Sequence, residues 1–195
     1  MKKIMQVIIA LSLLPLSGLA LAHTGSHESM GLLSGLLHPV LGMDHLVAML
    51  AIGLWLGMST RQNSWLPMAA FSLCMLAGVF LAVGGGLSLG SIDIGVALSL
   101  LVVGLLLASK MALPVAFSAI LISLFALFHG GAHGVEMPFS ASPLLYGLGF
   151  LLSTAALQGV GLVLGRMVQQ ARTEWLLRSA GLAASGFGAW LLLSA

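Results

Sequence analysis

The stretch LLHPVLGMDHLVAML, residues 36–50, places three groups that bind metals or protons inside an otherwise apolar segment. These groups are His38, Asp44 and His45. An aspartate at the centre of a membrane helix costs roughly 3 kcal/mol on insertion scales, so such residues normally mark a pathway or face a partner. The apolar residues on either side of this stretch decide the fold, and the polar groups within it indicate a function.

The composition of the chain is typical of a membrane protein. Of its 195 residues, 59% are hydrophobic and only 6% are charged, whereas about a quarter of the residues in a soluble domain are charged. Lys2 and Lys3 belong to the N-terminal segment, and the other five basic residues equal the five acidic ones in number. There is no basic patch, which excludes nucleic acid as a partner. The single Cys74 excludes an intrachain disulfide framework.

Long apolar runs predict six membrane helices. A bilayer core is crossed by about 20 apolar residues, and only helices or closed barrels satisfy their own backbone in lipid. The alternating pattern of barrel strands is missing from this sequence. We therefore predict an all-α, polytopic helical bundle that forms a single domain over residues 23–195. Its spans are expected at about 31–57, 65–84, 92–109, 113–130, 143–165 and 175–194.

Residues 1–22 have the pattern of a secretory signal peptide. Two lysines precede the apolar run IMQVIIALSLLPL, and Ala20-Leu21-Ala22 forms a small-x-small cleavage site. Cleavage would make His23 the mature N-terminus and place it in a bacterial periplasm. An uncleaved first helix is the alternative.

The basic residues predict the orientation of the bundle. With the mature N-terminus outside, every basic residue of the mature chain falls in or beside a cytoplasmic loop, namely Arg61, Lys110, Arg166, Arg172 and Arg178. The two outer loops, GGLSLGSID and HGGAHGVEMPFSASP, contain no Lys or Arg. This distribution follows the positive-inside rule. It predicts a bacterial inner-membrane protein with a periplasmic N-terminus.

Small residues at four-residue spacing predict close contacts between helices. In lipid, such spacing lets helix backbones approach each other, and here it recurs at Gly31/Gly35, Gly53/Gly57 and Gly161/Gly165. The methionines are expected to serve packing rather than to bind a soft metal; they include Met43, Met49, Met58 and Met75.

The first polar cluster raises a geometric question. His38 and His45 share a helix face, but seven residues separate them by about 10 Å along an unbroken helix. They can share one metal ion only if Pro39 and Gly42 distort the helix, and both are plausible sites for a break. Otherwise the two imidazoles mark successive positions along one track.

The second polar cluster lies in FHGGAHGVEMP, residues 128–138. His129, His133 and Glu136 fall on one face if the segment is helical, and two histidines four residues apart are a common chelating arrangement. The glycines of this stretch and Pro138 predict that the helix ends or unwinds here. Irregular backbone at membrane depth is tolerated where it lines a cavity.

The predicted topology brings the two clusters together. The first span runs inward and the fourth runs outward, so both clusters are expected toward the periplasmic side. Imidazole and carboxylate ligands suit Ni²⁺, Co²⁺, Zn²⁺ or Cu²⁺ better than Ca²⁺ or Mg²⁺. A proton relay without metal and purely structural polar packing are the alternatives.

Three further polar residues lie near the predicted outer side. The segment HTGSHES contains His23 and His27, which either form a metal-capturing arm or belong to a short flexible tail. Asp93 either attracts cations to the mouth of a pathway or caps the third span, and a helix cap is the favoured interpretation.

The two motifs HPVLGMDHLVAM and FHGGAHGVE, with the signal peptide and the six spans, resemble the HupE/UreJ family of small nickel permeases. The resemblance covers essentially the whole mature chain, and the polar positions of both motifs match. It implies transport of Ni²⁺, or alternatively Co²⁺, across the cytoplasmic membrane to supply a hydrogenase or a urease. It also implies that the metal is cargo and that no cofactor is permanently bound. The expected partners are a divalent metal ion, the lipid bilayer and, indirectly, hydrogenase or urease maturation proteins; a homo-oligomer is compatible with the sequence.

Two other classes of function remain open from the sequence. Two histidines and an acid can hold zinc and activate water in an intramembrane enzyme. However, the second motif lacks the glutamate that follows the first histidine in zinc proteases, and no nucleophile-elbow motif is present. The other alternative is a subunit that senses metal or assists assembly without transporting. A nucleotide-driven motor is not expected, because the sequence lacks a Walker A loop.

Overall fold

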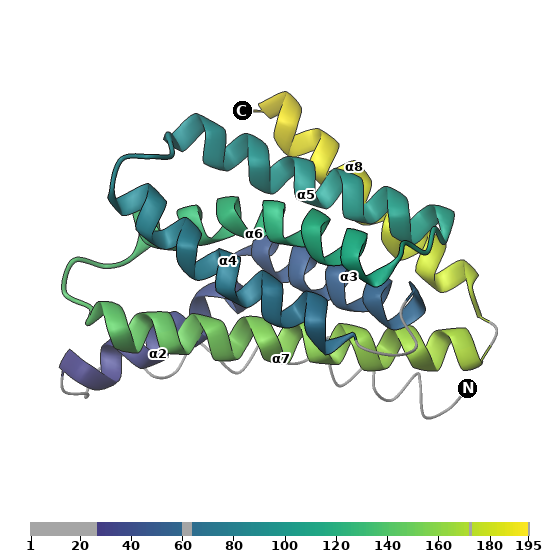
Figure 1. The fold of residues 1–195 in the computed structure, drawn as a ribbon, viewed down its shortest axis with the longest axis horizontal. Helices are drawn as coiled ribbons and strands as arrows, with labels where there is room; N and C mark the ends of the chain where they lie inside the picture. The colour runs from purple at the N-terminus through teal and green to yellow at the C-terminus, as the bar shows by residue number, and fades with distance from the viewer. Residues whose placement is uncertain (1–26, 60–63, 172, 195) are drawn as a thin grey trace.

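The computed structural model describes residues 27–59, 64–171 and 173–194, which contain helices but no strands (Figure 1). The helices are α2 (His27–Leu41), α3 (Met43–Ser59), α4 (Trp65–Val83), α5 (Leu89–Ser109), α6 (Val115–Glu136), α7 (Pro143–Gln170) and α8 (Trp175–Ser194). The predicted signal peptide and His23 lie outside the described residues. His27 is the first residue of α2, and its side chain also lies outside the described part of the chain.

The all-helical membrane fold is confirmed, with one change in the first span. Five of the described helices are each long and apolar enough to cross a bilayer, and α2 and α3 together form a sixth candidate span that bends by 75°. Pro39 lies within the last turn of α2, and Gly42 is the single residue between the two helices. The predicted first span is therefore interrupted at Gly42, with the geometry of either a broken span or a re-entrant loop.

The helices pack as three main groups. α4 lies along α6, α5 lies along α8, and both α2 and α3 lie along α7 (Figure 1). Glycines allow the closest of these contacts, as their spacing predicted. A Cβ atom at Gly53 would overlap the carbonyl oxygen of Gln158, and one at Gly161 would lie 2.5 Å from the carbonyl oxygen of Leu50. The backbones of α3 and α7 therefore touch where the two helices cross.

We expect Gly161→Ala to lower the melting temperature of the purified protein, because its methyl group must push α7 away from α3. Such overpacking typically costs about 1–3 kcal/mol. Gly159→Ala is the matched control, because a Cβ at Gly159 meets nothing within 4 Å and alanine favours a helix. Thermal unfolding in detergent compares the two variants. Equal melting temperatures would contradict the close α3–α7 contact.

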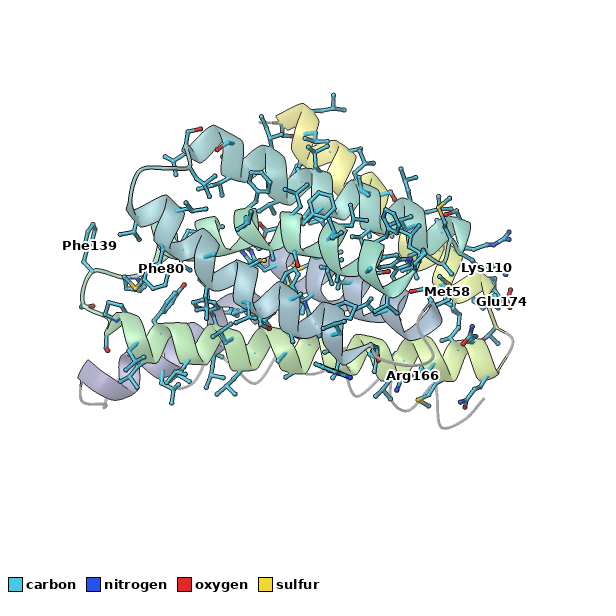
Figure 2. The ribbon with its side chains drawn as sticks, in the orientation of Figure 1. Met58, Phe80, Lys110, Phe139, Arg166 and Glu174 are labelled. Atoms are coloured by element: carbon cyan, nitrogen blue, oxygen red, sulfur yellow. The ribbon has the colours of Figure 1, made fainter. Side chains whose placement is uncertain are left out.

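The two ends of the bundle differ in chemistry. At one end, Lys110 forms an ion pair with Glu174, and Nη2 of Arg166 donates a hydrogen bond to Oγ of Ser64 at 2.8 Å. Figure 2 shows Lys110, Arg166 and Glu174 at this end, which we call the basic end. At the opposite end, α2 meets α3 and α6 ends at Glu136. We call this the histidine end, because both polar clusters lie toward it.

Candidate metal site

The break between α2 and α3 brings two histidines together. His38 lies in the last turn of α2 and His45 in the first turn of α3. The centroids of their rings are only 5.5 Å apart, whereas an unbroken helix would separate the residues by about 10 Å along its axis. The 75° bend thus supplies the distortion that a shared ion requires. The break lies at Gly42, and Pro39 stays helical.

α6 continues as a regular helix through its glycine-rich stretch and ends only at Glu136. The expectation that the helix ends within residues 128–138 is confirmed, because α6 ends at Glu136, two residues before Pro138, but the helix does not unwind at the glycines. The glycines serve helix packing instead: a Cβ at Gly130 would overlap the carbonyl oxygen of Met75 on α4. Because the helix is intact, His129 and His133 stay on one face, with exposures of 0% and 1%.

Three imidazoles converge at this point. His38, His45 and His133 each offer one ring nitrogen, and these three nitrogens lie within 4.8 Å of one another. Nitrogens bound at 2.0–2.1 Å around a tetrahedral ion lie roughly 3.4 Å apart. The cluster therefore needs to contract by little more than about 1 Å to hold one ion. We call these three residues the histidine cluster.

The ring of His133 is held in place by packing alone. It stacks on Phe150 with the ring centroids 4.5 Å apart and the planes at 7°. Neither of its ring nitrogens has a hydrogen-bond partner, although the residue is almost fully buried. Leaving a buried polar group unpaired costs about 1–3 kcal/mol. A buried, oriented and unpaired imidazole is suited to bind a metal ion.

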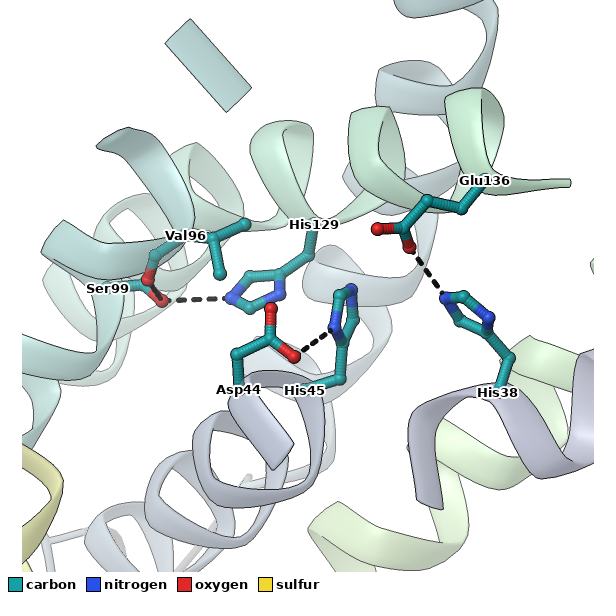
Figure 3. A network of polar contacts seen from close by, with 7 residues as sticks. All are labelled: His38, Asp44, His45, Val96, Ser99, His129 and Glu136. Atoms are coloured by element: carbon teal, nitrogen blue, oxygen red, sulfur yellow. Dashed lines mark hydrogen bonds and ion pairs between the residues drawn. The ribbon is translucent and has the colours of Figure 1, made fainter. Parts of the chain in front are cut away.

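Asp44 orients the ring of His45. Nδ1 of His45 donates a hydrogen bond to Oδ1 of Asp44 at 3.0 Å (Figure 3). The lone pair is then on Nε2, which is buried and has no partner. A carboxylate on one imidazole nitrogen is the usual support for a metal bound to the other, because it fixes the tautomer and makes the ring more basic. Asp44 thus contacts His45 and is not one of the three residues of the histidine cluster.

Glu136 connects α6 to α2. Its Oε2 lies 2.9 Å from Nε2 of His38, which is close enough for an ion pair but out of line for a hydrogen bond (Figure 3). The side chain of Glu136 is about half exposed, at 51%. Both acidic residues predicted at the site therefore contact a histidine of the cluster.

His129 lies beside the cluster and is held by Ser99. The hydroxyl of Ser99 donates to the carbonyl oxygen of Val96 at 2.6 Å, so its oxygen accepts the Nε2–H of His129 at 2.9 Å (Figure 3). This leaves a lone pair on Nδ1 of His129, which is buried and unpaired. The ring centroids of His129 and His45 are 5.3 Å apart. The sequence analysis did not identify Ser99; its only signal was a hydroxyl within the apolar run of α5.

An acidic cavity of about 220 Å³ adjoins these residues. Its lining includes three carboxylates, those of Asp44, Asp93 and Glu136. The preferred interpretation of Asp93 as a helix cap is wrong, because α5 begins at Leu89 and the oxygen of Ser88 accepts the cap hydrogen bond. Two of the three carboxylates, those of Asp44 and Glu136, also contact histidines of the cluster. The cavity and the histidine cluster therefore share these two residues.

Comparisons with known proteins identify the family of this chain. Residues 11–191 match the family described as HupE / UreJ protein. Protein HupE of Rhizobium leguminosarum bv. viciae is 34% identical over 191 residues, which cover 98% of this chain and 99% of that protein. No solved structure matches the chain significantly. The resemblance seen in the two histidine motifs is confirmed: this chain belongs to the HupE/UreJ family.

Proposed function

We propose that the chain is a permease that carries Ni²⁺, with Co²⁺ as the alternative cargo, across a bacterial cytoplasmic membrane to supply hydrogenase or urease maturation. The observation that carries the proposal is the histidine cluster at a helix break, beside a cavity lined by carboxylates. Family membership supports it. In this proposal the metal is the substrate, and the protein is not an enzyme.

The acidic cavity is the proposed entrance. Three carboxylates concentrate divalent cations by their field, which is strongest where low-dielectric walls surround the charges. A volume of about 220 Å³ accommodates several waters and therefore a partly hydrated ion. Asp44 and Glu136 each line the cavity and contact a cluster histidine, so in this proposal they transfer the ion from carboxylate oxygen to imidazole nitrogen.

The choice of ligands supports passage of a transition metal rather than its retention. Imidazoles select Ni²⁺, Co²⁺, Zn²⁺ and Cu²⁺ over Mg²⁺ and Ca²⁺, which prefer oxygen ligands. The described residues place no thiolate in the cluster, so the ion is held by neutral nitrogens. Conduction requires binding that is favourable enough for entry and weak enough for release.

We further propose that the histidine end faces the periplasm and the basic end faces the cytoplasm. Lys110 and Arg166 lie at the basic end (Figure 2), and basic residues favour the cytoplasmic side of a membrane. The signal-like segment at residues 1–22 supports the same orientation. Metal would then enter at the break between α2 and α3 and leave near the loops that follow α3, α5 and α7.

We expect Asp93→Asn to reduce the initial rate of Ni²⁺ uptake about tenfold at low Ni²⁺ and low salt, because steering by charge acts on the rate of encounter. The equilibrium affinity of the histidine cluster should stay unchanged, since Asp93 contacts none of its members in the described hydrogen bonds and ion pairs. Uptake by cells at several ionic strengths measures the effect. Asp93→Glu is the control that keeps the charge. A rate that is insensitive to both charge and salt would contradict the entrance.

Flux through the purified chain tests the proposed function. The protein is reconstituted into sealed liposomes that contain a Ni²⁺-sensitive fluorophore, and Ni²⁺ is added outside. We expect wild-type protein to admit Ni²⁺ and a His45→Ala/His133→Ala variant to admit none. Metal binding without flux in the wild type would instead identify a sensing or assembly subunit and overturn the proposal.

A further inference from the structure

We infer that a second, inner metal-binding station lies between the histidine cluster and the basic end, formed by the Met49 thioether, the Thr154 hydroxyl and the Gln158 amide oxygen. This inference rests on the proposed transport function. It assigns a role to three buried residues that the histidine cluster does not use.

One face of α7 leads away from the histidine cluster. Tyr146, Phe150, Thr154 and Gln158 recur every four residues, so they share a face, and their exposures are 1%, 1%, 0% and 0%. Phe150 stacks on His133. With a rise of 1.5 Å per residue, Thr154 lies about 6 Å and Gln158 about 12 Å beyond Phe150 toward the basic end.

α3 supplies the third residue. Met49 lies one helical turn beyond His45 in the same direction and is fully buried. Nε2 of Gln158 donates to Sδ of Met49 at 3.6 Å, across the crossing of α3 and α7. The glycines at this crossing, Gly53 and Gly161, hold the two backbones in contact. Met49 and Gln158 therefore contact each other in the interior, inward of the imidazoles, and the buried Thr154 lies one turn before Gln158 on the same face of α7.

Two oxygens at this place lack hydrogen-bond partners. Oγ1 of Thr154 and Oε1 of Gln158 are both buried and unpaired. A hydroxyl within a helix ordinarily bonds the carbonyl four residues back, as Ser59, Ser72 and Ser185 do here at 2.7–3.1 Å. The great majority of buried polar groups in proteins are paired. Two unpaired acceptors on successive turns of one helix face are suited to receive a cation.

The ligand chemistry fits the second step of a relay. A thioether sulfur and two neutral oxygens bind a borderline metal ion more weakly than three imidazoles do. The terminal amide torsion of glutamine is broad and roughly two-fold, so a half-turn of Gln158 points its oxygen at Met49 in place of its nitrogen. Two sites in series let an ion leave a favourable site without a large barrier. In this proposal Met49 has a role in addition to the packing predicted from the sequence.

A structural role for these residues makes a different prediction. Replacing an unpaired buried polar side chain by an apolar one of the same shape is nearly neutral or stabilising. If Thr154 and Gln158 only pack, apolar substitutes should keep both stability and transport. If they bind the ion in transit, the same substitutes should keep stability and lose transport.

The test uses the full chain in liposomes with Ni²⁺ as the probe. We expect the variants Met49→Leu and Thr154→Val/Gln158→Leu to slow Ni²⁺ flux about tenfold or more, as losses of ligand support do at metal sites. The melting temperature of Thr154→Val/Gln158→Leu should equal or exceed that of the wild type, because the whole amide is removed. Met49→Leu removes the acceptor of Nε2 of Gln158, so its melting temperature should fall slightly while the protein still folds. Both variants are therefore compared as folded proteins. In equilibrium titrations of the detergent-solubilised protein they should keep the tighter Ni²⁺ site and lose a weaker one. Met111→Leu and Gln170→Leu are matched controls at exposed positions and should behave as wild type.

The possible outcomes distinguish a failure of the inner metal-binding station from a failure of the proposed transport function. Wild-type flux in variants that lack Thr154 and Gln158 would overturn the inner station while the permease stands. Loss of the tighter site together with flux would also overturn it, because the residues would then support the histidine cluster. Absence of flux in the wild type would reject the permease itself.

Discussion

Replacing His133 with phenylalanine is expected to abolish Ni²⁺ binding at the histidine cluster, and with it Ni²⁺ flux, while the protein still folds. Phenylalanine keeps the planar ring that stacks on Phe150. It removes two buried ring nitrogens that have no hydrogen-bond partner, and the loss of unpaired polar atoms from a buried site does not destabilise it. Isothermal titration with Ni²⁺ and liposome flux measure the two losses.

The control for this variant is its own stability. We expect the melting temperature of His133→Phe in detergent to match or exceed that of the wild type, so that loss of binding reflects loss of a ligand. A folded variant that still binds Ni²⁺ with wild-type affinity would remove His133 from the site. An unfolded variant would contradict the packing of its ring against Phe150.

Asp44→Asn is expected to weaken Ni²⁺ binding about 10- to 100-fold, the usual cost of changing the partner that supports a metal-bound histidine. Asparagine keeps the size of the side chain and an oxygen near Nδ1 of His45. It removes the negative charge that makes the imidazole of His45 a more basic metal ligand and offsets the positive charge of the ion. Titrations of the purified variant at fixed pH and low salt measure the change in Kd.

Asp93→Asn is the matched comparison for this prediction. Both substitutions remove one negative charge from the same cavity, but only Asp44 is hydrogen-bonded to a cluster histidine. We expect the Asp44 variant to change the affinity and the Asp93 variant to change mainly the uptake rate. The same small effect on Kd from both variants would show that Asp44 acts only through its charge in the cavity.

The sequence predicts most of the fold because the bilayer restricts the choices. Apolar length identifies the spans, and the glycine pairs correctly predict close approach, as Gly53 and Gly161 show. From the sequence alone, a bend in the first span is required if His38 and His45 are to share an ion, but it is not predicted to occur. Pro39 and Gly42 permit a break, but its place and angle depend on how α2 and α3 each pack along α7. Such contacts are not encoded within the segment itself.

The sequence predicts that a metal site exists, but it does not predict which residues form it. Both histidine motifs were identified, but their spacing does not show which imidazoles meet. The position of α6 along its axis places His133 beside His38 and His45, whereas His129, one turn earlier on the same face, is bonded to Ser99. The glycines beside them suggested an unwound helix, although they serve the contact between α6 and α4 at Met75. Asp93 was misassigned because Ser88, five residues earlier, caps α5.

The most direct test of the account is Ni K-edge X-ray absorption on purified wild-type protein loaded with less than one equivalent of Ni²⁺. We expect about three imidazole nitrogens bound to the ion, from His38, His45 and His133, at roughly 2.0–2.1 Å. We also expect the imidazole scattering to be lost in His45→Ala/His133→Ala. A shell of oxygen atoms only, unchanged between the wild type and this variant, would contradict the account.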